Sequence, residues 1–191
     1  MVYPPAEDSW LLENEVKNYI SKLKNKPTRV LDMGSGSGIQ ALACISSGIK
    51  KSSILCADID KEAVKFLKKS GLIAVHSDLF SKIRGKFGLI IFNPPYLPED
   101  KEEYDKEKDT TAGKKGYETI LLFLKQAKQH LSKGGSILLL FSSLSKPRII
   151  LSCAKQQGYR AEKLAEKRLF FEKLYVYRMK KSYPLHFILY L

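Results

Sequence analysis

The chain has 191 residues, of which 44% are hydrophobic and 28% are charged, an ordinary composition for one soluble domain that buries a core of its own. Glu7 and Asp8 lie within the first ten residues, and no apolar run reaches the roughly 20 residues that a membrane span needs, so we expect a cytoplasmic protein with no signal peptide and no membrane partner. The net charge of +13 favours an anionic partner such as RNA, a ribosome-associated factor or an acidic protein, although scattered lysines on solvated helix faces account for it equally well.

Segments with helical spacing and segments with strand character alternate along most of the chain. The first, from Trp10 to Leu23, repeats its apolar residues at helical spacing and predicts an amphipathic helix. The alternation that follows is typical of a mostly parallel sheet with helices on both faces. We predict strands at 28–32, 52–57, 72–76, 87–92 and 135–142, and helices at 38–47, 61–70, 116–131 and 145–157.

The C-terminal part departs from this alternation. Residues 159–169 and 170–178 follow one another without a helix pattern between them, which predicts a strand pair and an antiparallel strand that closes the sheet. The expected sheet therefore has seven strands. Residues 97–115 are mostly charged and predict a long loop beside the end of the fourth strand, a place where long loops usually serve a substrate.

The pattern predicts a single α/β domain over residues 1–191, because it contains no internal repeat and no second core. An N-terminal helical segment at 1–27 precedes a core at 28–182. The apolar tail at 183–191 is too short to span a membrane, and it either adds an edge strand or meets a partner.

The segment VLDMGSGSGIQAL at 30–42 reads as a strand, a glycine-rich turn and a helix. Such a turn lets the backbone approach a ligand closely, and the helix N-terminus that follows favours negative charge. Gly34, Gly36 and Gly38 have the spacing G-x-G-x-G, which differs from the dinucleotide fingerprint G-x-G-x-x-G, and no G-K-[ST] for a nucleotide triphosphate follows. The spacing therefore argues against hydride transfer and against ATP chemistry.

Three acids follow or end three neighbouring strands, and each suits one part of a single ligand. Asp32 is placed to accept from an ammonium group, Asp58 from the two hydroxyls of a ribose, and Asp78 from the exocyclic amine of an adenine. S-adenosylmethionine carries all three groups and needs no triphosphate machinery. The alternative is that each Asp only caps the helix after it.

The segment FNPPYLP at 92–98 ends an apolar strand abruptly, because two prolines remove two backbone donors. The side-chain oxygen of Asn93 and the carbonyl of Pro94 can together accept both N–H bonds of a planar NH₂ group. Pro94 and Pro95 fix the direction of that carbonyl through their locked φ angles, and Tyr96 can stack on the planar group and exclude water. This arrangement predicts methyl transfer to an amide or aromatic amine by positioning, without a general base.

The cysteines and histidines predict no metal site. Cys44, Cys56 and Cys153 have no C-x-x-C spacing and are odd in number, so we expect buried thiols that fill space. His76, His130 and His186 also lack partner spacing, which favours packing or surface roles.

With the glycine turn and NPPY both present, the sequence resembles the HemK family of class I S-adenosylmethionine-dependent protein-glutamine methyltransferases. The likeness covers nearly the whole chain and rests on six segments: VYPPAEDS, VLDMGSGSG, ADID, SDLF, FNPPYLP and RLFFEKLYVYRM. Bacterial members carry an extra N-terminal helical domain, and this chain resembles the short branch of archaea and eukaryotes, which lacks it. The resemblance implies a Rossmann-like class I fold, with a motif that gates the cofactor within residues 1–27.

The resemblance also implies a set of site residues. The cofactor contacts would come from Ser9, Asp32, Gly34, Gly36, Gly38, Asp58, Asp78, Leu79 and Asn93. Asn93 to Tyr96 would hold the substrate, which in this family is the glutamine of the Gly-Gly-Gln motif in a class I peptide-chain release factor. Adenine N6-methylation of RNA or DNA, protein-lysine methylation and a binding module without activity remain the alternatives.

The short branch works with a small zinc-binding activator subunit, and the third predicted strand offers a place for one. Residues 72–76, LIAVH, are apolar and are expected at an edge of the sheet, and exposed edges are normally covered or charged. We therefore expect the activator to pair with this edge. The other possibility is that the strand is short enough to tolerate solvent.

Overall fold

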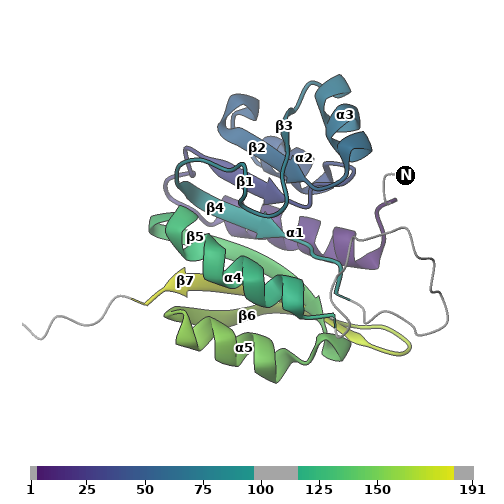
Figure 1. The fold of residues 1–191 in the computed structure, drawn as a ribbon, viewed down its shortest axis with the longest axis vertical. Coiled ribbons are helices and arrows are strands. Elements are labelled where there is room, and N and C mark those ends of the chain that lie inside the picture. The colour runs from purple at the N-terminus through teal and green to yellow at the C-terminus, as the bar shows by residue number, and fades with distance from the viewer. Residues whose placement is uncertain (1–3, 97–115, 183–191) are drawn as a thin grey trace, which may run out of the picture.

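A seven-stranded sheet organises the part of the chain that the structure, a computed structural model, describes, namely residues 4–96 and 116–182 (Figure 1). The strand order is β3-β2-β1-β4-β5-β7-β6. Strands β1 to β5 pair in parallel, whereas β7 runs antiparallel to both β5 and β6. The strands are β1 (Val30–Met33), β2 (Ile54–Asp58), β3 (Ile73–His76), β4 (Phe87–Phe92), β5 (Leu131–Ser142), β6 (Tyr159–Arg168) and β7 (Lys173–Lys181).

Helices cover both faces of the sheet, and each face has its own apolar core (Figure 1). Helices α1 (Glu7–Ser21), α2 (Ile39–Ser46) and α3 (Lys61–Lys69) pack on one face through residues such as Leu12, Cys44 and Leu67. Helices α4 (Glu118–His130) and α5 (Pro147–Gln156) pack on the other through Phe123 and Ile150. Two short 3₁₀ helices complete the elements, η1 (Lys51–Ser53) and η2 (Ser143–Ser145).

Strand β4 shows why the central strands read as continuous apolar runs. Leu89 and Ile91 belong to the core on the α1 face, whereas Ile90 and Phe92 belong to the core on the α4 face. Side chains of a strand alternate between the two faces of the sheet, and here both faces are buried. A parallel strand with helices on both sides therefore has no solvent-facing position. Its sequence is apolar throughout and does not alternate with polar residues.

The predicted fold class, the seven strands, the antiparallel closure and the edge position of the third strand are confirmed. Most boundaries agree within two residues, and three strand ends differ by more, including the end of β7 at Lys181 and not at residue 178. Strand β5 begins at Leu131, directly after α4, and not at residue 135. Strand β7 begins at Lys173 and not at residue 170, because residues 169–172 form the hairpin turn, in which the Leu169 N–H donates to the Glu172 carbonyl at 2.8 Å. The predicted loop at 97–115 and the tail at 183–191 lie outside the described residues.

The packing of the glycine turn makes a stability prediction. Gly38 has a φ of 80°, and a Cβ at this position would lie 2.8 Å from a methyl of Leu67 and 3.1 Å from a methyl of Leu72. Gly134 has a similar φ of 75°, but no described atom lies within 4 Å of its Cβ position. We expect Gly38→Ala to lower the unfolding free energy by about 2–4 kcal/mol, from left-handed strain plus overpacking, and Gly134→Ala by about 1 kcal/mol, from strain alone. Urea unfolding of both variants measures the difference, and equal losses would contradict the packing argument.

Candidate active site

The carboxyl ends of β1, β2 and β4 meet at one edge of the sheet. Strand β1 pairs in parallel with β2 on one side and with β4 on the other, so that Met33 lies opposite both Ala57 and Phe92. The strand order reverses between β1 and β4, and ligands of open parallel sheets bind at such a reversal, outside the carboxyl ends. The glycine turn after β1 and the NPPY segment after β4 therefore flank the same place.

The glycine turn follows β1 in an unusual backbone conformation. Gly34, Gly36 and Gly38 all have positive φ angles, of 62°, 49° and 80°. A Cβ on Gly34 would approach the Phe92 ring to 3.3 Å, whereas none of the described atoms lies within 4 Å of the Cβ position of Gly36. The turn thus packs closely against β4 on one side and leaves open space at Gly36, as a backbone that approaches a ligand must.

Asp58, the last residue of β2, holds the glycine turn in place. Its Oδ2 accepts a hydrogen bond from the Gly36 N–H at 2.8 Å, and its Oδ1 accepts one from the Asp60 N–H at 2.9 Å. The side chain is 9% exposed. Each carboxylate oxygen has a second lone pair, so Asp58 can hold the turn and still accept from a diol.

Asp32 is a buried carboxylate beside this turn. It is 1% exposed, and its Oδ2 has no hydrogen-bond partner among residues 4–96 and 116–182. Burial raises the pKa of the Asp32 carboxyl from 3.8 to about 7; hydrogen bonds from Ser35 and from the Ala41 backbone lower this pKa, and the negative charge of Asp58 raises it. A buried carboxyl with an unused oxygen and a raised pKa is suited to a cationic group of a ligand.

The residues predicted to hold an adenine lie after β3. Asp78 is exposed, unlike the other two acids, whereas Leu79 is 8% exposed and has a φ of 41°. A positive φ is strained for a leucine, and the Ser77 hydroxyl stabilises it by donating to the Leu79 carbonyl at 2.8 Å. The Ser77 N–H in turn donates to the Asp58 carbonyl at 2.9 Å, which ties this segment to β2.

The NPPY segment is anchored at both of its ends. The Asn93 Nδ2 donates to Asp8 Oδ2 at 2.9 Å, and the buried Asn93 Oδ1 has no partner in the described part of the chain. The Ser145 hydroxyl donates to the Tyr96 carbonyl at 2.8 Å, and the Tyr96 side chain is half-buried against both cores. Between them Pro94 is buried and Pro95 is exposed. A rigid segment therefore presents an unused acceptor oxygen at the carboxyl edge.

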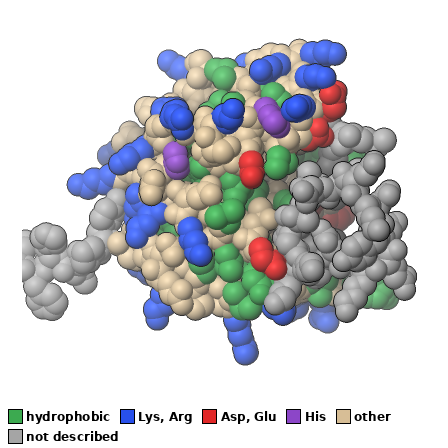
Figure 2. Space-filling model, viewed as in Figure 1, with side chains coloured by type: hydrophobic (Ala, Val, Ile, Leu, Met, Phe, Trp, Pro, Cys, Tyr) green, Lys and Arg blue, Asp and Glu red, His purple; other side chains and the backbone are tan. Residues whose placement is uncertain are grey.

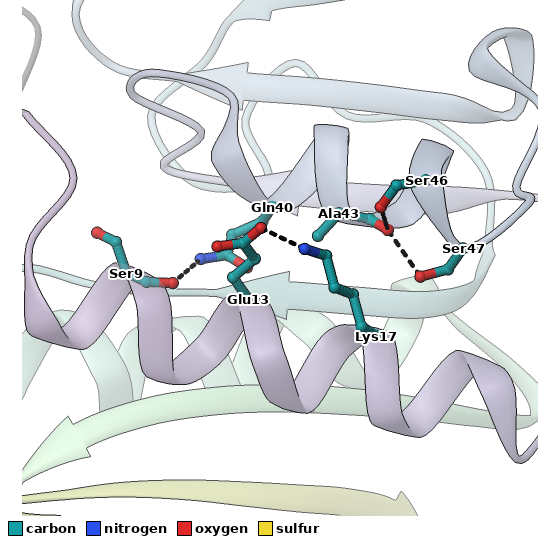
Figure 3. Close-up of polar contacts among 7 residues, drawn as sticks. All are labelled: Ser9, Glu13, Lys17, Gln40, Ala43, Ser46 and Ser47. Atoms are coloured by element: carbon teal, nitrogen blue, oxygen red, sulfur yellow. Dashed lines mark hydrogen bonds and ion pairs between the residues drawn. The ribbon is translucent and has the colours of Figure 1, made fainter.

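The first turn of α1 joins the site from the N-terminal side. Ser9 is 4% exposed, and its carbonyl accepts from the Gln40 Nε2 of α2 at 3.0 Å (Figure 3). Farther along, the Lys17–Glu13 pair of α1 faces α2 in the same view. The Gln40 Oε1 is a further buried oxygen without a partner among the residues described.

The structure places most of the predicted site residues at this one edge, from α1, β1, β2 and β4. Sequence reasoning missed Asp8 and Gln40. Asp8 stands within VYPPAEDS, the same segment that singled out Ser9, and Gln40 stands two residues after Gly38. An acid next to the predicted Ser9 was the available signal for Asp8, but its partner Asn93 is 85 residues away.

The three thiols, and the two imidazoles within residues 4–96 and 116–182, make packing contacts or hydrogen bonds. All three cysteines are buried, as predicted, and burial raises the pKa of Cys56 to about 12. A ring nitrogen of His76 lies 2.9 Å from the Ile59 carbonyl, and His130 stacks on Phe80. The described residues contain no group of three metal-binding side chains, and none of their helices is long and apolar enough to cross a membrane.

Comparisons with known proteins identify methyltransferases. The family model of the methyltransferase small domain matches residues 16–163. A Methanocaldococcus jannaschii protein named as a protein N5-glutamine methyltransferase is 38% identical, over 92% of this chain and 89% of its own length. The Schizosaccharomyces pombe eRF1 methyltransferase catalytic subunit mtq2 is 27% identical, over 93% of this chain and 88% of its own length. The solved Mtq2–Trm112 complex of E. cuniculi has a TM-score of 0.72 at 23% identity, and the match covers 94% of this chain and 98% of that one.

The fold is that of the class I methyltransferases, and solved structures of this fold include complexes with S-adenosylmethionine. The chain belongs to the methyltransferase small domain family and, within it, to the HemK family of S-adenosylmethionine-dependent methyltransferases. The resemblance found in the sequence is thereby confirmed. S-adenosylmethionine is the cofactor, as the glycine turn and the three acids predicted.

The raised pKa of Asp32 predicts how stability depends on pH. The folded protein binds this proton more tightly than the unfolded chain, so the contribution to stability is complete below pH 3.8 and is lost as pH rises through about 7. The unfolding free energy of the cofactor-free protein should therefore fall by a few kcal/mol between about pH 4 and 8.

Denaturant unfolding at pH 5 and pH 8 tests this dependence. We expect Asp32→Asn to remove most of the fall, because a neutral side chain has no charge to desolvate. Asp78→Asn is the matched control, since this acid of the predicted set is exposed. A pH dependence that is the same in wild type and in Asp32→Asn would contradict the assignment.

Proposed function

We propose that the chain transfers the methyl group of S-adenosylmethionine to the side-chain amide nitrogen of the glutamine in the Gly-Gly-Gln motif of a peptide-chain release factor. The observation that carries the proposal is the buried, unpartnered Asn93 Oδ1 at the carboxyl edge, an acceptor suited to an N–H donor from a substrate. The names of the relatives from M. jannaschii and S. pombe support this substrate class.

Each cofactor contact is assigned by the chemistry of the residue. Asp32 would pair its carboxylate with the ammonium group, which gives a buried charge the counterion that it lacks. Asp58 would accept from the ribose diol, and Asp78 with Leu79 would hold the adenine. Ser9 and the turn from Gly34 to Gly38 would line the remaining surface. The bound cofactor supplies an electrophilic methyl group on a sulfonium sulfur.

The NPPY segment would prepare the substrate nitrogen. An amide nitrogen is a poor nucleophile because its lone pair is delocalised, and two hydrogen bonds in the amide plane orient the group so that the lone pair faces the methyl. Asn93 Oδ1 and the Pro94 carbonyl would accept these two bonds, and Tyr96 would cover the planar amide. No residue has to remove a proton before transfer, because the methylated nitrogen is positively charged and loses its proton to water afterwards.

The loss of the Asn93 acceptor should affect turnover far more than cofactor binding. We expect Asn93→Ala to lower kcat by about 10²–10³, as for the loss of one donor or acceptor that acts in the transition state, and to change cofactor affinity by a much smaller factor. Asn18→Ala is the control, because Asn18 lies on the exposed part of α1. Calorimetry with the cofactor and initial rates with labelled methyl measure the two effects, and equal losses would make Asn93 a cofactor ligand only.

The substrate itself is identified by offering labelled cofactor together with separate pools of release factor, ribosomal RNA, DNA and histone-like protein. We expect label in the release factor and none after its Gly-Gly-Gln glutamine is replaced by alanine. Label in RNA or DNA would instead support adenine methylation, because an exocyclic NH₂ presents the same two donors to Asn93 and Pro94. Label on a histone-like lysine would contradict the role given to the NPPY segment, since a lysine amine must first lose a proton.

We also propose that a small zinc-binding activator protein covers the free edge of β3. Among the strands that the structure describes, β3 pairs only with β2, and three large apolar side chains of this region are about half exposed: Ile59 at 48%, Phe66 at 45% and Ile73 at 50%. Figure 2 shows hydrophobic side chains among Lys and Arg side chains over the part of the surface formed by α3 and β3. The assembly of the E. cuniculi relative and the name catalytic subunit of the S. pombe relative support a second protein.

A charge on this edge should separate the two proteins. We expect Ile73→Lys to weaken activator binding at least ~10-fold, because a lysine blunts an exposed strand edge. Leu122→Lys is the control, since Leu122 is 48% exposed on α4, on the opposite face of the sheet. Pull-down and methyl transfer with and without the activator measure the effect. Full activity of the wild-type chain as a soluble monomer would overturn the dependence.

A further inference from the structure

The carboxylate of Asp8 is the direct partner of the Asn93 amide. Asp8 lies in the first turn of α1, is 6% exposed, and accepts from Asn93 Nδ2 at 2.9 Å. Because the proposed function needs the oxygen of Asn93 and not its nitrogen, the orientation of this amide decides whether the site can accept an N–H. The question is what holds it.

An ionised carboxylate can only accept hydrogen bonds, and an amide has one donor end and one acceptor end. With Asp8 on one side, the Asn93 NH₂ must face Asp8 and Oδ1 must face away, because the flipped amide would place two oxygens against each other. The two ends of an asparagine amide are otherwise nearly equivalent in shape. Asp8 therefore selects one of the two orientations of the Asn93 amide, which shape alone does not distinguish.

Asp8 is itself held rigidly. Its other oxygen, Oδ1, accepts from the Ser9 N–H at 2.7 Å and from the Ser9 hydroxyl at 3.3 Å. The Gln40 side chain fixes the Ser9 carbonyl at 3.0 Å, which locks this turn to α2. A negative charge in the first turn of a helix is also stabilised by the helix dipole. The carboxylate can therefore impose an orientation on Asn93 instead of following it.

We propose that Asp8 is a positioning residue for methyl transfer that acts through Asn93, an inference that rests on the proposed function of the NPPY segment. Asp8 sets the orientation of the Asn93 amide so that Oδ1 faces the substrate. The charge-assisted bond at Nδ2 also polarises the amide and makes Oδ1 a better acceptor. Asp8 touches neither the transferred methyl nor the substrate nitrogen.

Asp8→Asn keeps the shape of the side chain and allows the Asn93 amide to flip. We expect kcat to fall about 10- to 100-fold, in proportion to the loss of a charge-assisted hydrogen bond, while the Kd for S-adenosylmethionine stays within about threefold. Glu7→Gln is the matched control, since Glu7 is the preceding residue and pairs with Lys167 on the exposed surface, and it should leave both values unchanged. If Asp8→Asn does not fold, Asp8→Ser replaces it, because serine also suits the first turn of a helix.

A double-mutant cycle separates positioning from a merely structural role. In the Asn93→Ala background, where no amide remains to be oriented, Asp8→Asn should change the residual rate by less than about twofold. A loss of the same size in both backgrounds would overturn the proposal, because Asp8 would then act without Asn93. A rise in the cofactor Kd that equals the fall in kcat would overturn it too, because Asp8 would be a cofactor ligand.

The side-chain NH₂ resonance of Asn93, assigned by its disappearance in Asn93→Ala, gives a readout that needs no substrate. We expect Asp8→Asn to move this resonance and Glu7→Gln to leave it in place; a resonance that is unchanged in Asp8→Asn would overturn the proposal. This measurement also distinguishes the two hypotheses. If the wild-type chain methylates none of the substrate pools, the proposed function fails, while the resonance still decides whether Asp8 orients Asn93.

Discussion

Parallel pairing of β1 with both β2 and β4 is the constraint on which the rest of the site depends. The shared register brings the ends of three strands to one edge. The residues that follow those ends therefore lie close together. Asp58 comes from β2, the glycine turn from β1, and Asn93 from β4. The strand order reverses between β1 and β4, which is where open parallel sheets bind their ligands.

The site carries a cost in stability that the packed cores offset. Four buried side-chain atoms lack a hydrogen-bond partner within residues 4–96 and 116–182, and three of them lie at this edge: Asp32 Oδ2, Gln40 Oε1 and Asn93 Oδ1. Each unsatisfied buried group costs about 1–3 kcal/mol. Their concentration at one place is what a preorganised binding site requires, since acceptors already satisfied by the protein would have to be released before they could hold a ligand.

Much of this arrangement could be predicted from the sequence because it is encoded locally. A few neighbouring residues are enough to recognise the G-x-G-x-G turn, the acids at the strand ends and the double proline. The alternation of strand and helix patterns along the chain predicts the parallel sheet. The bond between Asp8 and Asn93 could not be predicted, because 85 residues separate its partners. Asp32 is 1% exposed and has a raised pKa because of the way α2 packs over β1. A local sequence pattern does not predict that packing. The turn at 169–172 was missed because Phe170 and Phe171, which read as strand residues, project into solvent at 92% and 86% exposure.

The contacts at Ser9 and Asp8 link the start of α2 to the NPPY segment. Asp8 orients the NPPY side of the site, while the Ser9 carbonyl is held by Gln40 at the start of α2, directly after the glycine turn. One turn of α1 thus spans from the helix after the glycine turn to Asn93. A ligand that stabilises the glycine turn and the N-terminus of α2 would therefore also stabilise the first turn of α1. Through Asp8 it would stabilise the orientation of Asn93 Oδ1 as well. On the proposed function, four hydrogen bonds among Asp8, Ser9, Gln40 and Asn93 connect the amide that would orient the substrate nitrogen with the helix that follows the glycine turn, and this connection needs no movement of the sheet.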